Sequence, residues 1–285
     1  MQIRNQNKRE YLMKKKNALY RDCLIVLLLG MLGFAGNAES KIIVIGGLTH
    51  EHRVQPGDVI AGTIRIRNTG GQTEEVKLYQ TDYFFQSDGT NAYGEPGSSE
   101  RSNAPWIVFS PSQMTVPPGE DMNVEYRIHV PEGDTLRGTY WSMMMVEAIP
   151  GSAYDVERMS RGVGINMIMR YGIQMVTHFG ESGQRMIQFL DAAIQNEGED
   201  FQLHVDIRNT GERWLRPDVW VEMYDLEGNL IGNFKGQKLR TYPGTSVRQR
   251  FDLTDVSVGT YKALVVADCG DEDLFGIQYN LKIEE

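Results

Sequence analysis

Residues 64–70 read Ile64-Arg65-Ile66-Arg67-Asn68-Thr69-Gly70, and the last five recur as Ile207-Arg208-Asn209-Thr210-Gly211. In both copies apolar and polar residues alternate up to the asparagine, which is typical of a strand with one face on a core and one in water. Asn and Gly then favour a turn, because both tolerate left-handed backbone and the Asn side chain can bond its own turn. The stretch therefore predicts two strands that run into the same kind of turn.

Two further matches follow in the same order along the chain. Pro118-Gly119 recurs as Pro243-Gly244, and Gly138-Thr139-Tyr140 recurs as Gly259-Thr260-Tyr261. Three matches in one order indicate two copies of a single module. The offset between the copies falls from 141 to 121 residues, which places about 20 extra residues in the first copy. We expect residues 86–104, which are rich in Ser, Gly, Asn and Glu, to be this insertion and to form an exposed loop.

The remainder of the chain reads as short strands separated by turn residues such as Pro56-Gly57 and Gly228-Asn229. No long stretch combines a helical period with helix caps, and short strands at this spacing are typical of a sandwich or barrel. The predicted strands span residues 41–45, 59–67, 75–85, 106–109, 123–130, 139–148, 165–178, 186–195, 202–208, 218–224, 247–253, 261–267 and 275–283.

The repeated Gly-Thr-Tyr stands at the start of a predicted strand in each copy. It resembles the tyrosine corner of immunoglobulin-like sandwiches, in which the Tyr hydroxyl bonds the backbone a few residues upstream. We therefore expect an all-β protein with two tandem immunoglobulin-like β-sandwich domains. The polar link Gly180-Glu181-Ser182-Gly183 should separate an N-terminal domain at 39–180 from a C-terminal domain at 184–285.

The first 38 residues have the layout of a secretory signal peptide. Seven Lys and Arg residues precede an apolar stretch of 12 at residues 24–35, and the small residues Gly36-Asn37-Ala38 follow it. An apolar stretch of this length is too short to span a bilayer comfortably, so we expect a cleaved peptide, with a retained anchor as the alternative. The mature chain is then expected in the periplasm or secreted.

Charge and cysteine content bound the remaining function classes. Without residues 1–38 the chain keeps 22 basic against 36 acidic residues, a formal net charge of −14. Such an acidic surface argues against nucleic-acid binding and against anionic membranes, because both reward clustered Lys and Arg. Cys269 is the single cysteine left, so core burial has to hold the fold together without an internal disulfide.

Residues that could carry chemistry are few and scattered. His50 and His52 could share one strand face and hold a metal, but no third ligand stands nearby in the sequence. Cys269 is expected to be a small buried hydrophobe. The acidic residues within 268–273 match no calcium-loop spacing and read as a solvated turn. The run Met143-Met144-Met145 reads as a strand buried on both faces. We therefore expect no enzyme activity, no cofactor and no metal.

One candidate interaction segment remains, residues 162–176, which follows a polar loop at 150–161 and is long for a strand. The residues that alternate on one face before the charge at Arg170 are Val163, Ile165, Met167 and Met169. If this part of the strand lies at a sheet edge, its apolar residues are available to a strand of a partner. If it lies inside the sheet, the same residues are ordinary core. The sequence leaves both interpretations open.

Four motifs precede this segment in a fixed order. They are Ile64-Arg65-Ile66-Arg67-Asn68, Pro105-Trp106-Ile107-Val108-Phe109-Ser110-Pro111, Val116-Pro117-Pro118-Gly119 and Glu147-Ala148-Ile149-Pro150. With the long alternating strand, they resemble the periplasmic pilus-chaperone (PapD-like) family of tandem immunoglobulin-like proteins. The resemblance implies that a long strand donates alternating apolar residues to an incomplete pilus subunit. It also implies that a basic residue in the cleft between the domains grips the subunit's C-terminal carboxylate.

Carried over to this chain, the resemblance assigns a role to six residues. Val163, Ile165 and Met167 match the donor positions, and Met169 is next in the series. Arg170 and Arg53 are the matches for the carboxylate anchor. The implied function is that of a non-enzymatic, exported chaperone-like protein whose partner is a pilin-like or surface-structure subunit.

A weaker resemblance leads to the alternative function. The tandem repeat and the pattern Leu136-Arg137-Gly138-Thr139-Tyr140 are similar to surface proteins that interact with WxL-domain proteins. This would make the chain a secreted surface or adhesion module. Such a module would bind a protein or cell-wall ligand through loops such as residues 86–104.

Overall fold

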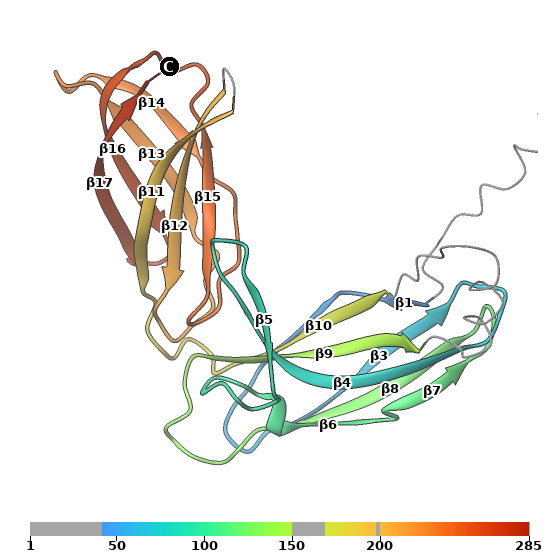
Figure 1. Ribbon diagram of the computed structural model, residues 1–285. Helices are drawn as coiled ribbons and strands as arrows, with labels where there is room; N and C mark the ends of the chain where they lie inside the picture. The colour runs from blue at the N-terminus through green and yellow to red at the C-terminus, as the bar shows by residue number, and fades with distance from the viewer. Residues whose placement is uncertain (1–41, 150–168, 198–199, 285) are drawn as a thin grey trace, which may run out of the picture. The chain divides into compact units, whose positions relative to one another are not determined.

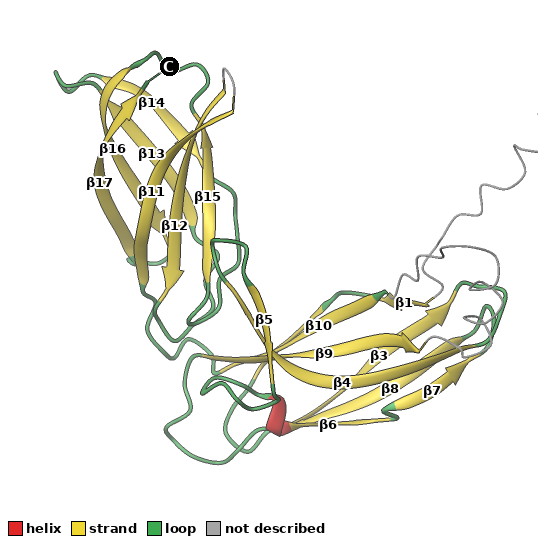
Figure 2. Cartoon of the chain, viewed as in Figure 1, coloured by secondary structure: helices red, strands yellow, loops and turns green. Residues whose placement is uncertain are grey.

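The computed structural model describes residues 42–149, 169–197 and 200–284. These ranges form seventeen β-strands and one short 3-10 helix, η1 (Ala104–Trp106). Figures 1 and 2 show how the labelled strands are arranged. The predicted all-β class is confirmed. The predicted signal peptide lies outside the described residues. Within them, no helix has the length and apolar character needed to cross a membrane.

The first half of the described chain makes two sheets. One has the strand order β1-β3-β8-β6, and the other has the order β2-β10-β9-β4-β5, with β7 also paired to β4. The strands of the first sheet are β1 (Ile42–Ile45), β3 (Val59–Asn68), β8 (Asp121–His129) and β6 (Ile107–Ser110). Those of the second are β2 (Thr49–Arg53), β10 (Arg170–His178), β9 (Thr139–Ile149), β4 (Glu74–Phe85), β5 (Asn91–Gly94) and β7 (Gln113–Val116). The pairing of β2 with β10 is parallel, and the others are antiparallel.

The second half makes two further sheets, with the orders β11-β12-β15 and β14-β13-β16-β17. All of their strand pairs are antiparallel. The strands are β11 (Ile187–Glu197), β12 (Asp200–Asn209), β13 (Asp218–Tyr224), β14 (Leu230–Lys235), β15 (Ser246–Asp252), β16 (Gly259–Asp268) and β17 (Leu274–Ile283). The tandem immunoglobulin-like sandwich fold predicted from the repeat is therefore confirmed.

Four strands escaped the sequence analysis, namely β2, β5, β7 and β14. Strand β2 reads Thr49-His50-Glu51-His52-Arg53 and has no apolar residue, so no alternation of hydrophobicity could mark it. Strands β5 and β7 are four residues long, which is too short for a period to show. Strand β14 exposes Leu230 and Ile231 in succession, contrary to the alternation of a half-buried strand.

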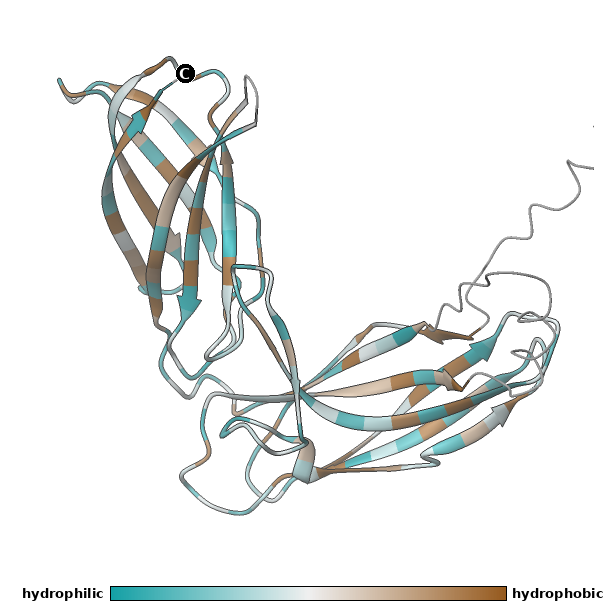
Figure 3. Cartoon of the chain, in the orientation of Figure 1, coloured by the Kyte–Doolittle hydropathy of each residue, from teal (hydrophilic) through white to brown (hydrophobic). Residues whose placement is uncertain are grey.

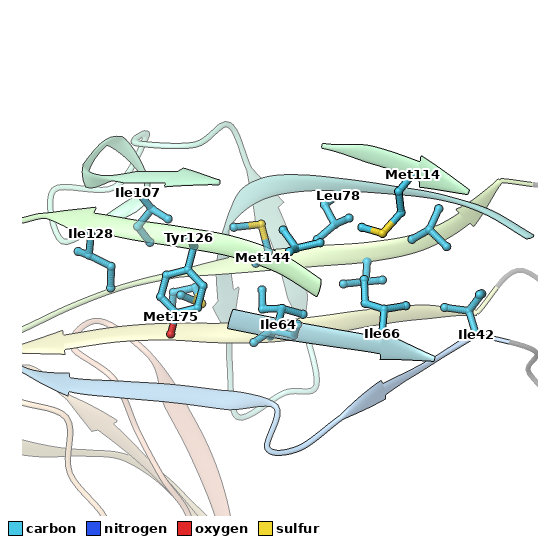
Figure 4. Close-up of a cluster of buried hydrophobic side chains, with 14 of the residues drawn as sticks. Ile42, Ile64, Ile66, Leu78, Ile107, Met114, Tyr126, Ile128, Met144 and Met175 are labelled. Atoms are coloured by element: carbon cyan, nitrogen blue, oxygen red, sulfur yellow. The ribbon is translucent and has the colours of Figure 1, made fainter. Parts of the chain in front are cut away.

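The core of each sandwich follows the alternation seen in the sequence, and Figure 3 shows the matching change of colour along the strands. Ile64 and Ile66 of β3 are buried while Arg65 and Arg67 between them are exposed. Figure 4 shows the buried side chains of the first sandwich facing one another from both sheets. The run Met143-Met144-Met145 is buried throughout, which confirms the prediction of a strand buried on both faces.

The repeated asparagines form the same buried joint in both sandwiches. The Asn68 amide donates to the carbonyls of Gln72 and Val116, and its Oδ1 accepts from the Gly70 amide. Asn209 does the same with Arg213, Thr241 and Gly211. The repeated glycines add to the joint, because Gly119 and Gly244 donate to the carbonyls of Asn68 and Asn209. The internal repeat of the sequence is therefore also a repeat of the structure.

The tyrosine corner is present in the second copy, where the Tyr261 hydroxyl donates to the Ser257 carbonyl at 2.8 Å. In the first copy, Tyr140 packs its ring against Trp106 and Phe179 at centroid distances of 4.8 and 5.8 Å. In the first Gly-Thr-Tyr, the tyrosine therefore contributes ring packing to its sandwich.

Replacing Asn209 by alanine tests the buried joint. The change leaves two carbonyls and one amide without their side-chain partner inside the protein, so we expect a loss of about 2–4 kcal/mol in the free energy of unfolding. Urea titration followed by tryptophan fluorescence measures it. Asn233→Ala, on the exposed face of β14, is the control, with an expected change within about 0.5 kcal/mol. Equal losses in the two variants would contradict the proposed role of the joint.

Candidate functional site

The long alternating strand of the sequence is β10, and its two edges are covered to different extents. Strand β9 pairs with β10 along its whole described length, from Arg170 to His178. Strand β2 pairs with it only from Gln174 onward, and the Leu48 carbonyl accepts from the Gln174 amide at 2.9 Å. Among the described residues, the β2 side of residues 170–173 therefore has no paired strand. This half-covered edge is the candidate site.

The side chains of β10 continue the alternation that precedes it. Ile173 and Met175 are fully buried in the core of the first sandwich, and Tyr171 packs against that core. Met169, next in the odd-numbered series toward the loop, is 42% exposed. One series of apolar residues thus passes from the core to the surface along the uncovered edge. The other predicted donor residues, Val163, Ile165 and Met167, lie outside the described residues.

Arg170, the first predicted anchor, is engaged in an ion pair within its own sheet. Its Nε lies 2.8 Å from Oε2 of Glu147, the residue opposite it on β9. Glu147 is buried and also contacts Lys77 Nζ at 3.0 Å and the Tyr79 hydroxyl at 3.0 Å. Burial alone would raise the pKa of Glu147, but the hydrogen bonds from Lys77 and Tyr79 and the nearby positive charges outweigh burial and lower it. The cluster therefore holds an ionised carboxylate beside the uncovered edge.

Arg53, the second predicted anchor, lies at the opposite end of β10. It stands opposite His178 in the register of β2, and its guanidinium is 3.5 Å from Glu181. Its side chain is about two-thirds exposed. Arg170 and the partner position of Arg53 are eight residues apart along one strand, or roughly 26 Å at about 3.3 Å per residue. A single carboxylate can contact one of these arginines but not both.

The covered half of β10 contacts the second sandwich, and residues 41–285 form one compact unit. The Tyr242 hydroxyl donates to Gln174 Oε1 at 2.9 Å. The Tyr242 ring stacks on Trp141 at a centroid distance of 4.4 Å, with Val176 in the same cluster. Arg240 reaches back to Glu51 of β2 at 3.1 Å. Sequence reasoning missed these contacts, because nothing in the local pattern marks a tyrosine before a Pro-Gly turn as a partner of β10.

Most of the insertion at residues 86–104 is exposed, as its composition predicted, but the segment is not a loop throughout. It forms strand β5 and part of η1, and the end of its hairpin contacts the second sandwich. The Ser87 amide donates to Ser246 Oγ at 2.9 Å, and the Ser246 hydroxyl donates to Gln86 at 2.7 Å. At the other end, the buried Asn103 amide donates to the Met175 carbonyl of β10 at 2.9 Å. The polar residues whose composition predicted a loop include several that form hydrogen bonds with other elements of the fold.

The other residues weighed for chemistry have structural partners. Burial raises the pKa of the Cys269 thiol to about 11, which leaves it protonated and unreactive at neutral pH. Asp271 and Asp273 of the acidic turn accept from Arg185 at 2.6 and 3.1 Å. Within the described residues, no group of three or more His, Cys, Asp or Glu side chains is arranged to hold a metal ion.

Comparison with known proteins gives similarity of structure only. No family model matches the chain, and no curated protein matches it. The solved class 5 fimbriae chaperone CfaA is similar over 86% of this chain and 100% of its own, at 10% identity and a TM-score of 0.44. The E. coli chaperone DraB covers 85% and 96% at 11% identity and 0.39. Pseudomonas aeruginosa CupB2 covers 85% and 100% at 11% and 0.39.

All three neighbours are chaperones, and CfaA is a chaperone of fimbriae, in agreement with the family that the sequence motifs resemble. At such identities and TM-scores, the likeness extends to the arrangement of strands and carries no inference about a partner.

Replacing Arg170 by methionine tests the carboxylate cluster through its pH dependence. Because the pKa of Glu147 is lowered in the folded protein, Glu147 stabilises the fold above its ordinary pKa and loses this contribution as the pH falls through the folded value. Without Arg170 that contribution shrinks. We expect a loss of about 0.5–1 kcal/mol at pH 7, small because Arg170 is half exposed, and no difference from wild type near pH 2.

Urea titrations between pH 2 and pH 7 measure this difference. Lys238→Met removes an ion pair with Asp218 in which both side chains are more than half exposed, so it should change stability little at any pH. An Arg170→Met deficit that stays the same across the pH range would show that Arg170 acts through packing instead.

Proposed function

We propose that this chain is a non-enzymatic, exported chaperone-like protein that binds a pilus or surface-structure subunit by β-strand addition along β10. The observation that carries the proposal is the half-covered edge. Residues 170–173 are paired with β9 and with no described strand on the other side. Directly before them stands the series Val163, Ile165, Met167 and Met169, which has the alternation of a strand with one apolar face.

The proposed mechanism uses both the backbone and the side chains of this segment. An added strand gains main-chain hydrogen bonds from the unpaired edge, and alternate side chains of the donor fill pockets in the partner. Fully burying one Val, Ile or Met side chain contributes about 1.5–3 kcal/mol. Four such side chains offset the cost of association and leave a surplus for binding. A partner that lacks one strand of its own sandwich is the kind of protein that fits.

The covered half of β10 supports the proposal by fixing the strand that is offered. Residues 174–178 are paired on both sides, and Gln174 and Val176 also contact the second sandwich. A rigid platform reduces the ordering cost that the partner's binding has to offset. The partner strand then meets an edge whose position is already set.

Arg53 and Arg170 are proposed as alternative anchors for a carboxylate of the partner. Arg53 lies at the linker end, is about two-thirds exposed, and its ion pair with Glu181 at 3.5 Å is long. Arg170 already pairs with the buried Glu147 at 2.8 Å. A carboxylate from the partner would meet less competition at Arg53, which makes Arg53 the preferred anchor.

The class of partner follows from the sequence motifs that resemble the pilus-chaperone family. A pilin-like or surface-structure subunit is accordingly the partner proposed here, and the periplasm is the proposed compartment.

Replacing Ile165 by aspartate tests strand addition. A charge in the middle of the donor series cannot enter an apolar pocket of the partner, so we expect capture of the partner to fall at least tenfold while the monomer stays folded. Co-expression with a pilin-like subunit, followed by co-purification, measures capture. Val108→Asp, at an exposed position on β6 of the other sheet, is the matched control and should capture normally.

Capture by Ile165→Asp at the wild-type level would remove the donor segment from the mechanism. Circular dichroism of both variants confirms that the comparison is made between folded proteins.

A further inference from the structure

Two histidines of β2 meet one tyrosine hydroxyl from the opposite sheet. His50 Nδ1 lies 2.8 Å from the Tyr126 hydroxyl oxygen, and His52 Nε2 lies 3.1 Å from the same atom. The histidines stand two residues apart, so their side chains share one face of the strand. In the sequence, no third ligand stands near this pair. In the structure, Tyr126 contacts both histidines, although it is more than 70 residues away from them in the chain.

The tyrosine oxygen is held at a fixed point. Tyr126 belongs to β8 and is only 2% exposed, and it is drawn among the core side chains in Figure 4. A Cβ atom on Gly62 of the neighbouring strand β3 would lie 2.2 Å from this oxygen. The hydroxyl therefore occupies space that only a glycine leaves free. Both imidazole rings pack against the phenol ring, at centroid distances of 5.5 and 6.1 Å.

Neutral imidazole is the form that ligates metals, and a ligating ring is usually oriented by donating its other N–H to a backbone carbonyl or a carboxylate.

We propose that His50, His52 and Tyr126 form a binding site for one divalent transition-metal ion of the copper or zinc class. Metal–nitrogen bonds of about 2.0–2.1 Å place ligand atoms of one ion about 3 Å apart. The two observed nitrogen–oxygen separations, 2.8 and 3.1 Å, lie within a few tenths of an ångström of that spacing. Imidazole suits both ions, and copper binds such donors more tightly than zinc.

Binding exchanges a proton for the ion. The Tyr126 hydroxyl loses its proton to solvent, and the phenolate oxygen bonds the metal. One hydroxyl hydrogen serves only one of the two rings, so the other ring presents its N–H to the oxygen. That ring shifts its proton to its other nitrogen by exchange with solvent, and both neutral imidazoles then give a lone pair to the ion without changing charge. Burial raises the pKa of Tyr126, which opposes this step, but the charge of the bound ion favours the phenolate. His50 and His52 are half-buried, so water can complete the coordination. The ion would tie β2, which covers part of β10, to the opposite sheet.

The test is titration of the full chain, without a polyhistidine tag, with Cu²⁺ and with Zn²⁺ by calorimetry. We expect one ion per chain, and affinity at least tenfold weaker in the double variant His50→Ala/His52→Ala. The double variant His129→Ala/His204→Ala removes two histidines elsewhere and should bind as wild type. With Cu²⁺, the wild type should also gain visible absorption from phenolate-to-copper charge transfer.

Tyr126→Phe separates the tyrosine from the histidines, since it keeps both imidazoles. We expect it to lose the visible absorption and at least tenfold in affinity. Wild-type affinity in the His50→Ala/His52→Ala variant, or no saturable binding to the wild type, would overturn the site. Absorption and affinity unchanged in Tyr126→Phe would remove Tyr126 from it. The absorption of the wild type decides this point even if a variant fails to fold.

Discussion

The site depends on how the first strands of the chain are shared between two sheets. Strand β1 pairs with β3 in one sheet, and β2 pairs with β10 in the other. The chain crosses between them in residues 46–48, where Gly46 adopts a φ of +106°, a conformation that side chains disfavour. Because β2 begins only at Thr49, it pairs with β10 from Gln174 onward, and no strand within the described ranges pairs with residues 170–173 on that side. The position of this crossing therefore sets the length of the open edge.

The sequence predicts those parts of the fold in which the type of a residue and its immediate neighbours determine whether it is buried. The alternation around Ile64 and Ile66 gives strand and core together, and the repeated Asn68 and Asn209 give two equivalent joints. Strand β2 could not be predicted, because it has no apolar residue and owes its place to pairing with β10. The same holds for the insertion. Its serines have the composition of a solvated loop, but Ser87 bonds Ser246, which is 159 residues away in the chain.

The site was predictable to the same extent. The apolar series up to Met169 is a local pattern, and it identified the strand that the structure leaves half covered. The ion-pair partners of the two proposed anchors could not be predicted, because they depend on strand register. Arg170 stands opposite Glu147, and Arg53 stands opposite His178, near the far end of the same strand. Which glutamate neutralises which arginine is decided by strand pairing, and a single sequence does not encode that pairing in any local form.

In the proposed strand addition, the two halves of β10 have different tasks, and the second sandwich contributes to one of them. Residues 174–178 are held by β9, by β2 and, through Gln174 and Val176, by Tyr242 of the second sandwich. Residues 170–173 are held by β9 alone among the described strands. In strand addition, a slip of one residue turns every apolar side chain to the wrong face. A donor strand therefore needs one end whose register is fixed. Strand β2 is a short edge strand, and the contacts of Gln174 and Val176 with the second sandwich add to the pairing that it provides.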